Sequence, residues 1–190
     1  MSKYAGSKYA VAVDSCTNSM FLCLKYLKAS GKIKIPKRTY LSVPQLIIHA
    51  GCDPEFVDLE WKGVYHLDPY PVVDSATRFT KNMYIKGTYQ CLSFHIRKNL
   101  PIAKGGMILT DDKDAYDWFK AAEYEGRDRR VPHDEMPEPT ICGWNMYMPP
   151  EQAARGIILF NELPETIPDC GGSYKYRDLS GYLMWNKNGI

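Results

Sequence analysis

The chain has 190 residues, of which 45% are hydrophobic, and its formal net charge at pH 7 is +2. A chain of this length can bury one substantial core, which favours a single domain over two. Basic and acidic residues are interleaved along the sequence, so the charge pattern gives no sign of a nucleic-acid-binding face.

The six cysteines are widely spaced, and several lie inside apolar segments. Because there is no CxxC pair and no Cys/His cluster, the sequence predicts no metal site. A free cysteine in an apolar segment behaves as a small hydrophobe, which favours a reducing, cytoplasmic setting. We find no signal peptide and no apolar run that could span a membrane, so we expect a soluble protein.

Apolar periodicity in the first third of the chain predicts alternating strands and helices. Residues 8–15 form a short apolar run typical of a strand, and residues 16–31 follow with apolar side chains at helical spacing. Gly31 is expected to end that helix. The pattern then predicts a strand, a helix and a strand, in that order, at 32–36, 43–51 and 53–59.

The alternation continues in the second half of the chain. Apolar runs predict three more strands, at 69–76, 88–95 and 105–112. Acidic residues at the start of 112–126 and two prolines at the start of 149–165 predict helices in both segments.

Strands that alternate with helices predict a three-layer α/β/α sandwich with a mostly parallel sheet over residues 1–165. Residues 166–190 lack clear periodicity and are expected to form an irregular tail. Ligands of such sheets bind beyond the carboxyl ends of the strands. Polar residues lie at three of these ends, so we expect a binding site where they meet, at 14–17, 74–77 and 93–98.

Ser15, Cys16 and Thr17 stand where the first predicted strand turns into a helix. The N–H groups of a helix start, with the helix dipole and the Thr17 hydroxyl, can bind a phosphate. Helix capping by Ser15 or Thr17 explains the same residues without any ligand. The sequence has no glycine-rich nucleotide loop, so both interpretations stay open on local grounds.

Asp74 and Lys98 lie at the ends of two successive predicted strands and suggest a shared cofactor. Pyridoxal 5′-phosphate requires a lysine to form an imine, a carboxylate to keep its pyridine nitrogen protonated, and donors for its phosphate. Asp74, Lys98 and the helix start are the residue types that meet these three needs. Each signal is weak alone, and together they are suggestive.

Five segments resemble the sugar aminotransferases of the DegT/DnrJ/StrS type, a family of fold type I pyridoxal phosphate enzymes. They begin with KYAVAVDSCTNSMFLCL, end with ICGWNMYMPPEQAARGIILFNEL and cover residues 7–163. The most specific segment is CLSFHIRKNLPIAKGGMILTDD, where the lysine follows SFH and precedes GGM. The chain is therefore identified as a shortened member of this family.

The resemblance implies a role for each matching residue. Lys98 matches the Schiff-base lysine, which forms the internal aldimine and moves the proton between substrate and cofactor. Asp74 matches the carboxylate that pairs with the pyridinium. The remaining matches are Cys16, Thr17 and Ser93 for the phosphate, Tyr40 for stacking on the ring, Thr77 near the ring hydroxyl, and Asn145 for the phosphate in the neighbouring subunit.

The resemblance also implies a homodimer that transfers an amino group, with glutamate as donor, to a keto-sugar nucleotide. This chain has only WKGVYHLDPY (61–70) where the family inserts a strand and a helix. The family's smaller C-terminal domain is expected to be missing or vestigial. Because these segments help to form the sugar pocket, a non-catalytic protein of the same fold, binding pyridoxal phosphate or a partner, is the alternative function.

Two other groups have structural interpretations. His95 lies close to Lys98, but in a strand that ends SFH it is expected to pack or to bond structurally. The loop at 125–135 carries Arg127, Arg129 and Arg130 where family members direct residues toward the partner's substrate. A solvated loop explains these arginines equally well.

Overall fold

The computed structural model describes residues 1–164 and 166–185. Five strands form the main sheet in the order β1-β7-β6-β5-β4. They are β1 (Tyr9–Val13), β4 (Tyr65–His66), β5 (Val72–Asp74), β6 (Tyr89–Ser93) and β7 (Gly106–Thr110). A second, two-stranded sheet consists of β2 (Lys32–Pro36) and β3 (Asp53–Val57).

The main sheet is mixed, rather than mostly parallel as predicted. β6 pairs in parallel with β5, whereas β7 is antiparallel to both β6 and β1, and the short β4 is antiparallel to β5. β2 and β3 pair in parallel with each other. Because β7 is antiparallel to both of its neighbours, β1, β5 and β6 run in one direction. Their carboxyl ends therefore meet at the same edge of the sheet, as predicted.

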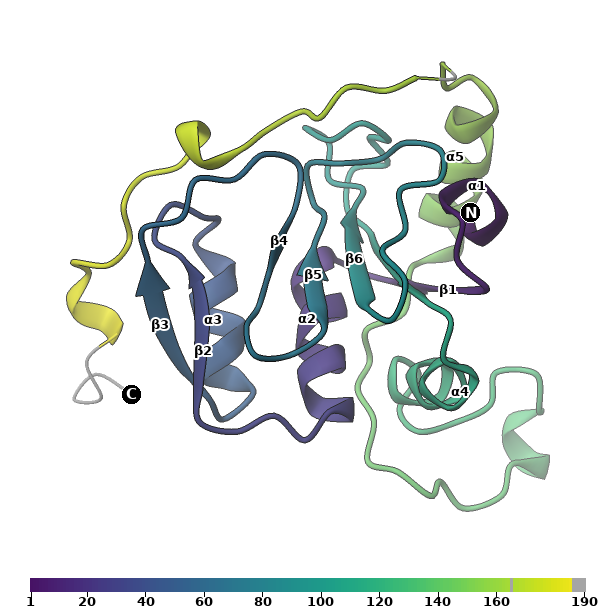
Figure 1. Ribbon diagram of the computed structural model, residues 1–190. Coiled ribbons are helices and arrows are strands. Elements are labelled where there is room, and N and C mark those ends of the chain that lie inside the picture. The colour runs from purple at the N-terminus through teal and green to yellow at the C-terminus, as the bar shows by residue number, and fades with distance from the viewer. Residues whose placement is uncertain (165, 186–190) are drawn as a thin grey trace.

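Helices cover both faces of the sheet, which confirms the predicted α/β fold (Figure 1). One buried cluster includes residues of α2 (Cys16–Tyr26), α3 (Ser42–His49) and α4 (Lys113–Ala122). The other cluster is packed by residues of α1 (Ser2–Ala5) and α5 (Pro150–Asn161). Successive residues of β1 and β7 alternate between the clusters, as a pleated strand between two layers requires.

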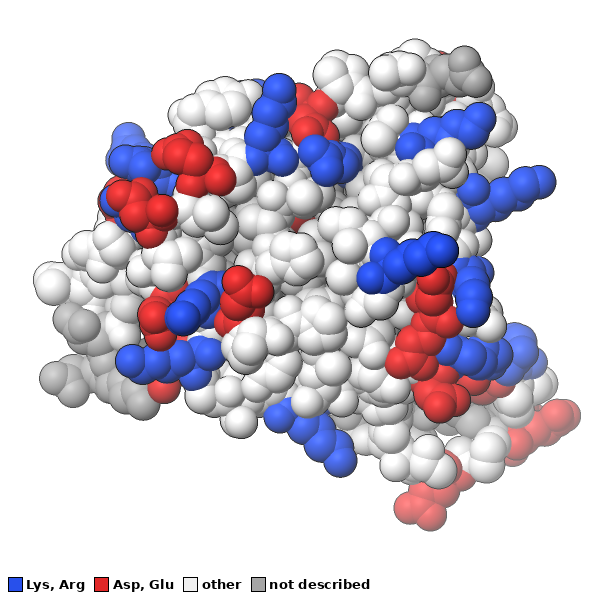
Figure 2. Space-filling view, in the orientation of Figure 1, with Lys and Arg blue, Asp and Glu red and all other residues white. Residues whose placement is uncertain are grey.

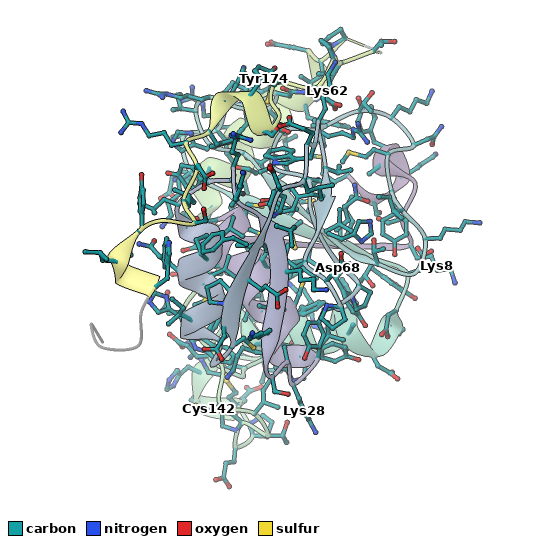
Figure 3. All side chains as sticks on the ribbon, turned by 60° about the vertical axis from the view of Figure 1, so that its left-hand side comes forward. Lys8, Lys28, Lys62, Asp68, Cys142 and Tyr174 are labelled. Atoms are coloured by element: carbon teal, nitrogen blue, oxygen red, sulfur yellow. The ribbon has the colours of Figure 1, made fainter. Side chains whose placement is uncertain are left out.

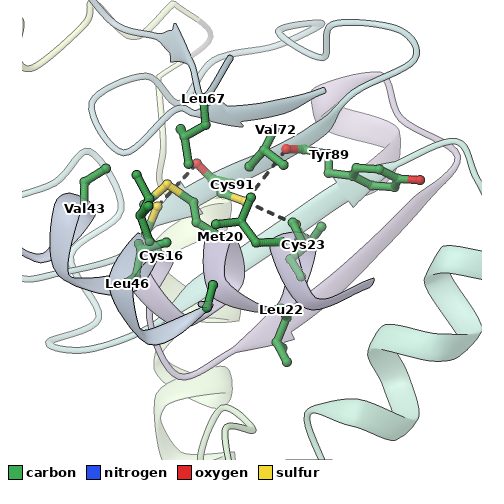
Figure 4. Packing of buried hydrophobic residues seen from close by; sticks show 14 of the residues in the cluster. Cys16, Met20, Leu22, Cys23, Val43, Leu46, Leu67, Val72, Tyr89 and Cys91 are labelled. Carbon is green, nitrogen blue, oxygen red and sulfur yellow. Dashed lines mark hydrogen bonds between the residues drawn. The ribbon is translucent and has the colours of Figure 1, made fainter. Parts of the chain in front are cut away.

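Three cysteines meet in the first cluster (Figure 4). The Cys16 thiol donates to the carbonyl of Cys91 at 3.5 Å, and the sulfurs of Cys23 and Cys91 lie 3.7 Å apart. Burial raises the pKa of the Cys16 and Cys91 thiols well above the usual range. The thiols of Cys16 and Cys91 are therefore neutral and pack in the core beside α2.

The predicted elements are present, and most of them are shorter than predicted. The helix expected over 16–31 ends at Tyr26, because Lys28 takes a φ of 50° and the N–H of Ala29 returns to the carbonyl of Leu24 at 2.9 Å. α1 and β4 were not predicted, since elements of four and two residues carry no periodicity. Residue 165, the end of the last predicted helix, and residues 186–190 lie outside the described part.

The tail crosses the top of the molecule in Figure 1 and contains two short 3₁₀ turns, Ser173–Lys175 and Leu183–Trp185. Asp169 fixes its start through two hydrogen bonds from the Arg78 guanidinium, at 2.8 and 2.7 Å. Figure 2 shows basic and acidic side chains interleaved over the surface in view. Within residues 1–164 and 166–185, no helix is both long and apolar enough to cross a membrane.

Candidate active site

A cavity of about 600 Å³ lies at the edge where β1, β5 and β6 end. All of the predicted site residues except Asn145 line it, namely Cys16, Thr17, Tyr40, Asp74, Thr77, Ser93 and Lys98. Asp74 and Ser93 are the last residues of β5 and β6, and Cys16 begins α2 just after β1. The topology therefore brings together residues that are far apart in the sequence.

Asp74 is a buried carboxylate, 6% exposed, that forms no ion pair with any described residue. Its Oδ1 accepts the N–H of Ala76 at 2.8 Å, and its Oδ2 accepts the hydroxyl of Tyr65 at 2.6 Å. Burial raises the pKa of Asp74, while these hydrogen bonds and the charge of Lys98 act in the opposite direction. A buried carboxylate without an ion-pair partner is costly, so the site favours a cationic ligand group at Asp74.

Tyr65 and Thr39 form a buried relay behind Asp74. The two hydroxyls are 2.5 Å apart, and both side chains are at most 3% exposed. The only proton of the Tyr65 hydroxyl goes to Asp74, so Thr39 must donate to Tyr65. The relay fixes one carboxylate oxygen and favours its charged form.

Tyr65→Phe is expected to weaken cofactor binding about 10-fold or more, because a hydrogen bond to a charged group contributes about 1.5–3 kcal/mol. The dissociation constant for pyridoxal phosphate, from an absorbance titration, measures this effect. Tyr89→Phe is the matched control, since the Tyr89 hydroxyl donates to Asp112 at 2.9 Å away from the cavity lining. Equal dissociation constants for Tyr65→Phe and the wild type would rule out the relay's influence on the site.

The start of α2 combines a cap with free donors. The Ser15 hydroxyl accepts the N–H of Asn18 at 3.1 Å, so the capping interpretation is correct. The first two helical N–H groups, of Cys16 and Thr17, have no acceptor within the helix, and both residues line the cavity. Capping and phosphate binding are therefore compatible at this helix start.

Gly106 allows the helix start to approach the sheet. A Cβ at this position would lie 2.3 Å from the carbonyl carbon of Ser15 and 2.5 Å from the nitrogen of Cys16. Both are backbone atoms that cannot move aside without shifting α2. Gly106, the second glycine of the GGM motif, thus lets β7 pack closely against the start of α2, where we expect the phosphate to bind.

Lys98 lies in the turn after β6, half-buried, and lines the cavity. Its backbone N–H donates to the carbonyl of His95 at 2.8 Å, and Nδ1 of His95 accepts the N–H of Arg97 at 3.3 Å. His95 therefore closes the turn in front of Lys98, in agreement with its predicted structural role. Among the described residues Lys98 has no ion-pair partner, which leaves its amine available for chemistry.

Tyr40 and Thr77 also line the cavity. The Tyr40 side chain is 60% exposed, and its ring centroid lies 6.5 Å from that of Tyr176. The Thr77 hydroxyl faces the carbonyls of Gly63 and Gly171, at 3.1 and 3.2 Å. Its proton is thus used within the protein, and only its oxygen lone pairs remain for a ligand.

Asn145 lies outside the cavity lining of its own chain. It is exposed, and its Nδ2 donates to Glu125 at 2.7 Å. The arginines of the adjacent loop are ion-paired within the loop or to α4's end: Arg127 with Glu125, Arg129 with Glu123 and Arg130 with Asp128. None of these arginines lines the cavity of its own chain.

Sequence reasoning missed several cavity residues and the relay. Trp61, Lys175 and Tyr176 line the cavity, and Tyr65 stands directly behind Asp74. These residues lie outside the five segments that carry the resemblance, at 61–70 and beyond 163. Trp61 and Tyr65 are aromatic residues in a short segment, and no sequence motif marks either of them.

Within the described part of the chain, the donor set fits pyridoxal phosphate: a buried carboxylate without an ion-pair partner, a lysine amine without an ion-pair partner and a helix start with two free N–H groups. The chain matches the DegT/DnrJ/EryC1/StrS aminotransferase family over residues 1–89 and 81–169. It therefore belongs to this family, as predicted.

Individual relatives agree with this assignment. The spore coat polysaccharide biosynthesis protein SpsC of Bacillus subtilis is 25% identical over 189 residues, covering 76% of this chain and 45% of SpsC. The structure of AtS13 from Actinomadura melliaura is similar with a TM-score of 0.72 at 16% identity, covering 83% of this chain and 56% of AtS13. The chain thus spans about half the length of its relatives.

The structure of DesI, solved in the presence of its TDP-sugar product, has the same fold. It matches with a TM-score of 0.65 at 20% identity, over 86% of this chain and 51% of DesI. At these identities the structural matches establish the fold of the chain, and its activity is a separate inference.

Proposed function

We propose that this chain binds pyridoxal phosphate and transfers an amino group from glutamate to a keto-sugar nucleotide. The observation that carries the proposal is the buried carboxylate of Asp74, which lacks an ion-pair partner among described residues and shares the cavity with Lys98. Family membership supports amino transfer. The TDP-sugar product of DesI supports a nucleotide sugar as acceptor.

Each of these cavity residues would have a different role. Asp74 would hold a proton on the pyridine nitrogen, with its orientation fixed by Tyr65 and Ala76. Lys98 would attach the cofactor and move a proton at its Nζ. When bound, the cofactor supplies an electron sink that stabilises negative charge on the substrate carbon. The N–H groups at the start of α2, with Thr17 and Ser93, would bind the phosphate.

The experiment adds pyridoxal phosphate to the purified protein and then L-glutamate without an acceptor. A visible absorbance band should develop with the cofactor, and glutamate should bleach it while one 2-oxoglutarate forms per site. A colourless protein would contradict cofactor binding. A band that no amino donor bleaches would instead support the alternative, a protein that binds the cofactor without turnover.

A homodimer with shared sites is part of the proposal. Asn145 is exposed on the surface and does not reach the cavity of its own chain, as expected for a residue that serves the neighbouring subunit. Gel filtration should give the mass of two chains. Elution at the mass of one chain would remove the role proposed for Asn145.

A further inference from the structure

One wall of the cavity consists of residues beyond the part of the chain that matches the family. The match ends at residue 169, yet Cys170, Gly171, Lys175 and Tyr176 all line the cavity. We call residues 170–176 the tail wall. The tail wall therefore lies just beyond the matched residues.

Backbone hydrogen bonds hold the tail wall in place. The N–H of Cys170 donates to the carbonyl of Thr77 at 2.8 Å, and the N–H of Gly63 donates to the carbonyl of Gly171 at 3.1 Å. The N–H of Ser173 donates to the carbonyl of Trp61 at 2.9 Å, and Ser173 is buried. The wall is thus an ordered part of the site.

The tail wall packs on residues 61–70, the short segment that precedes β5. The rings of Trp61 and Tyr176 stack with centroids 5.7 Å apart at 24°. Figure 3 shows Lys62 and Tyr174 next to each other at the top of the molecule, where a bridge joins Lys62 to Gly172. Trp61 and Tyr176 therefore line the cavity side by side.

The cavity lining has more basic than acidic residues. Its basic lining residues are Arg97, Lys98, Lys104 and Lys175. Asp74 is the only carboxylate among the lining residues. Lys98 and Asp74 serve the cofactor, and Lys104 pairs with Asp14 at 3.3 Å.

Lys175 is the basic group that the tail wall adds. Its ammonium donates one hydrogen bond, to the carbonyl of Cys170 at 2.6 Å, so two N–H donors remain. In the described part of the chain no carboxylate lies within ion-pair distance of it. Its Nζ also lies 5.9 Å from the centroid of the Tyr174 ring. An exposed ammonium in the cavity lining, without a carboxylate partner, is suited to bind an anionic group.

We propose that the tail wall is a substrate subsite, in which Lys175 binds an anionic oxygen group of the substrate beside the ring of Tyr176. The chemistry fits a carboxylate of the amino donor or a diphosphate of the acceptor. This inference rests on the proposed function, since it assigns Lys175 to the substrates of the same cavity.

The test measures dissociation constants by calorimetry on protein saturated with pyridoxal phosphate. Glutarate probes the carboxylate and UDP probes the diphosphate. Lys175→Ala is expected to weaken one of these ligands about 10-fold or more, as the loss of a charge-assisted hydrogen bond predicts. Lys175→Arg should keep most of the affinity. Whichever probe is weakened identifies the source of the anion.

Two variants separate binding from folding. Lys175→Gln removes the charge but keeps a donor for the Cys170 carbonyl, so it should lose affinity with the wall in place. Lys62→Ala removes a neighbouring charge that does not line the cavity, so both probes should bind as in the wild type. The visible cofactor band should be equal in all these variants.

The outcomes distinguish this inference from the proposed function. Unchanged affinity for both probes in Lys175→Ala and Lys175→Gln, or loss of the cofactor band in these variants alone, would overturn the tail-wall subsite. A wild type without any band would overturn the proposed function instead. The same titrations on cofactor-free protein would then decide the subsite. Any binding of the probes at the start of α2 would be the same in all variants, so a difference between variants would report on Lys175.

Discussion

Lys98→Ala is expected to lower the rate of amino transfer by about 1,000-fold or more, because it removes both the covalent attachment and the proton carrier. The cofactor should still bind, more weakly, because Asp74 and the start of α2 are unchanged. Borohydride reduction followed by peptide mapping should label Lys98 in the wild type. The variant should yield no labelled peptide.

Lys104→Ala is the matched control for Lys98→Ala. Lys104 also lines the cavity, but its ammonium pairs with Asp14 at 3.3 Å. A nonspecific loss of positive charge would affect both variants alike, whereas a covalent role should affect Lys98→Ala alone. Labelling of Lys104 in the wild type, or substantial turnover by Lys98→Ala, would contradict the assignment.

The positions of Asp74, Ser93 and Lys98 could be predicted because parallel strands present their carboxyl ends at one edge. That argument needs only the strand pattern, and β1, β5 and β6 do share a direction. It also tolerates the mixed sheet, since β7 reverses direction between β1 and β6 without moving their ends.

Tyr65 and Lys175 could not be predicted on the same grounds. Tyr65 lies in a two-residue strand, and its partner Thr39 is 26 residues away along the chain. Lys175 reaches the cavity because a tail without periodicity is tied to Arg78 and Trp61 by long-range contacts. Local patterns carry no information on such contacts, so these residues need the folded chain.

Asp74→Asn is expected to weaken cofactor binding by at least about 100-fold, because breaking a buried ion pair costs about 3–5 kcal/mol. The same substitution should stabilise the cofactor-free protein at neutral pH. Asparagine removes a buried charge that has no ion pair among the described residues. Affinity and stability should therefore change in opposite directions, which a loss of packing would not produce.

The pH dependence of stability has a defined sign. Burial raises the pKa of Asp74 in the folded protein, although Tyr65, Ala76 and Lys98 counteract it. At pH values between the pKa of Asp74 in the unfolded state and its higher pKa in the folded state, the folded protein binds more protons. The wild type therefore loses stability as pH rises through this range. Asp74→Asn removes this loss. Its stability relative to the wild type should increase from about pH 4 toward pH 7.

Asp112→Asn provides a control of opposite sign. Although Asp112 is partly desolvated, hydrogen bonds from the N–H of Ala115 and the hydroxyl of Tyr89 lower its pKa. Its contribution is present at neutral pH and lost as pH falls, so Asp112→Asn should be most destabilised at neutral pH. Urea unfolding of cofactor-free protein across this pH range measures both differences. Parallel curves for Asp74→Asn and the wild type would show that the carboxylate is not held in the unpaired, buried state on which the cofactor assignment depends.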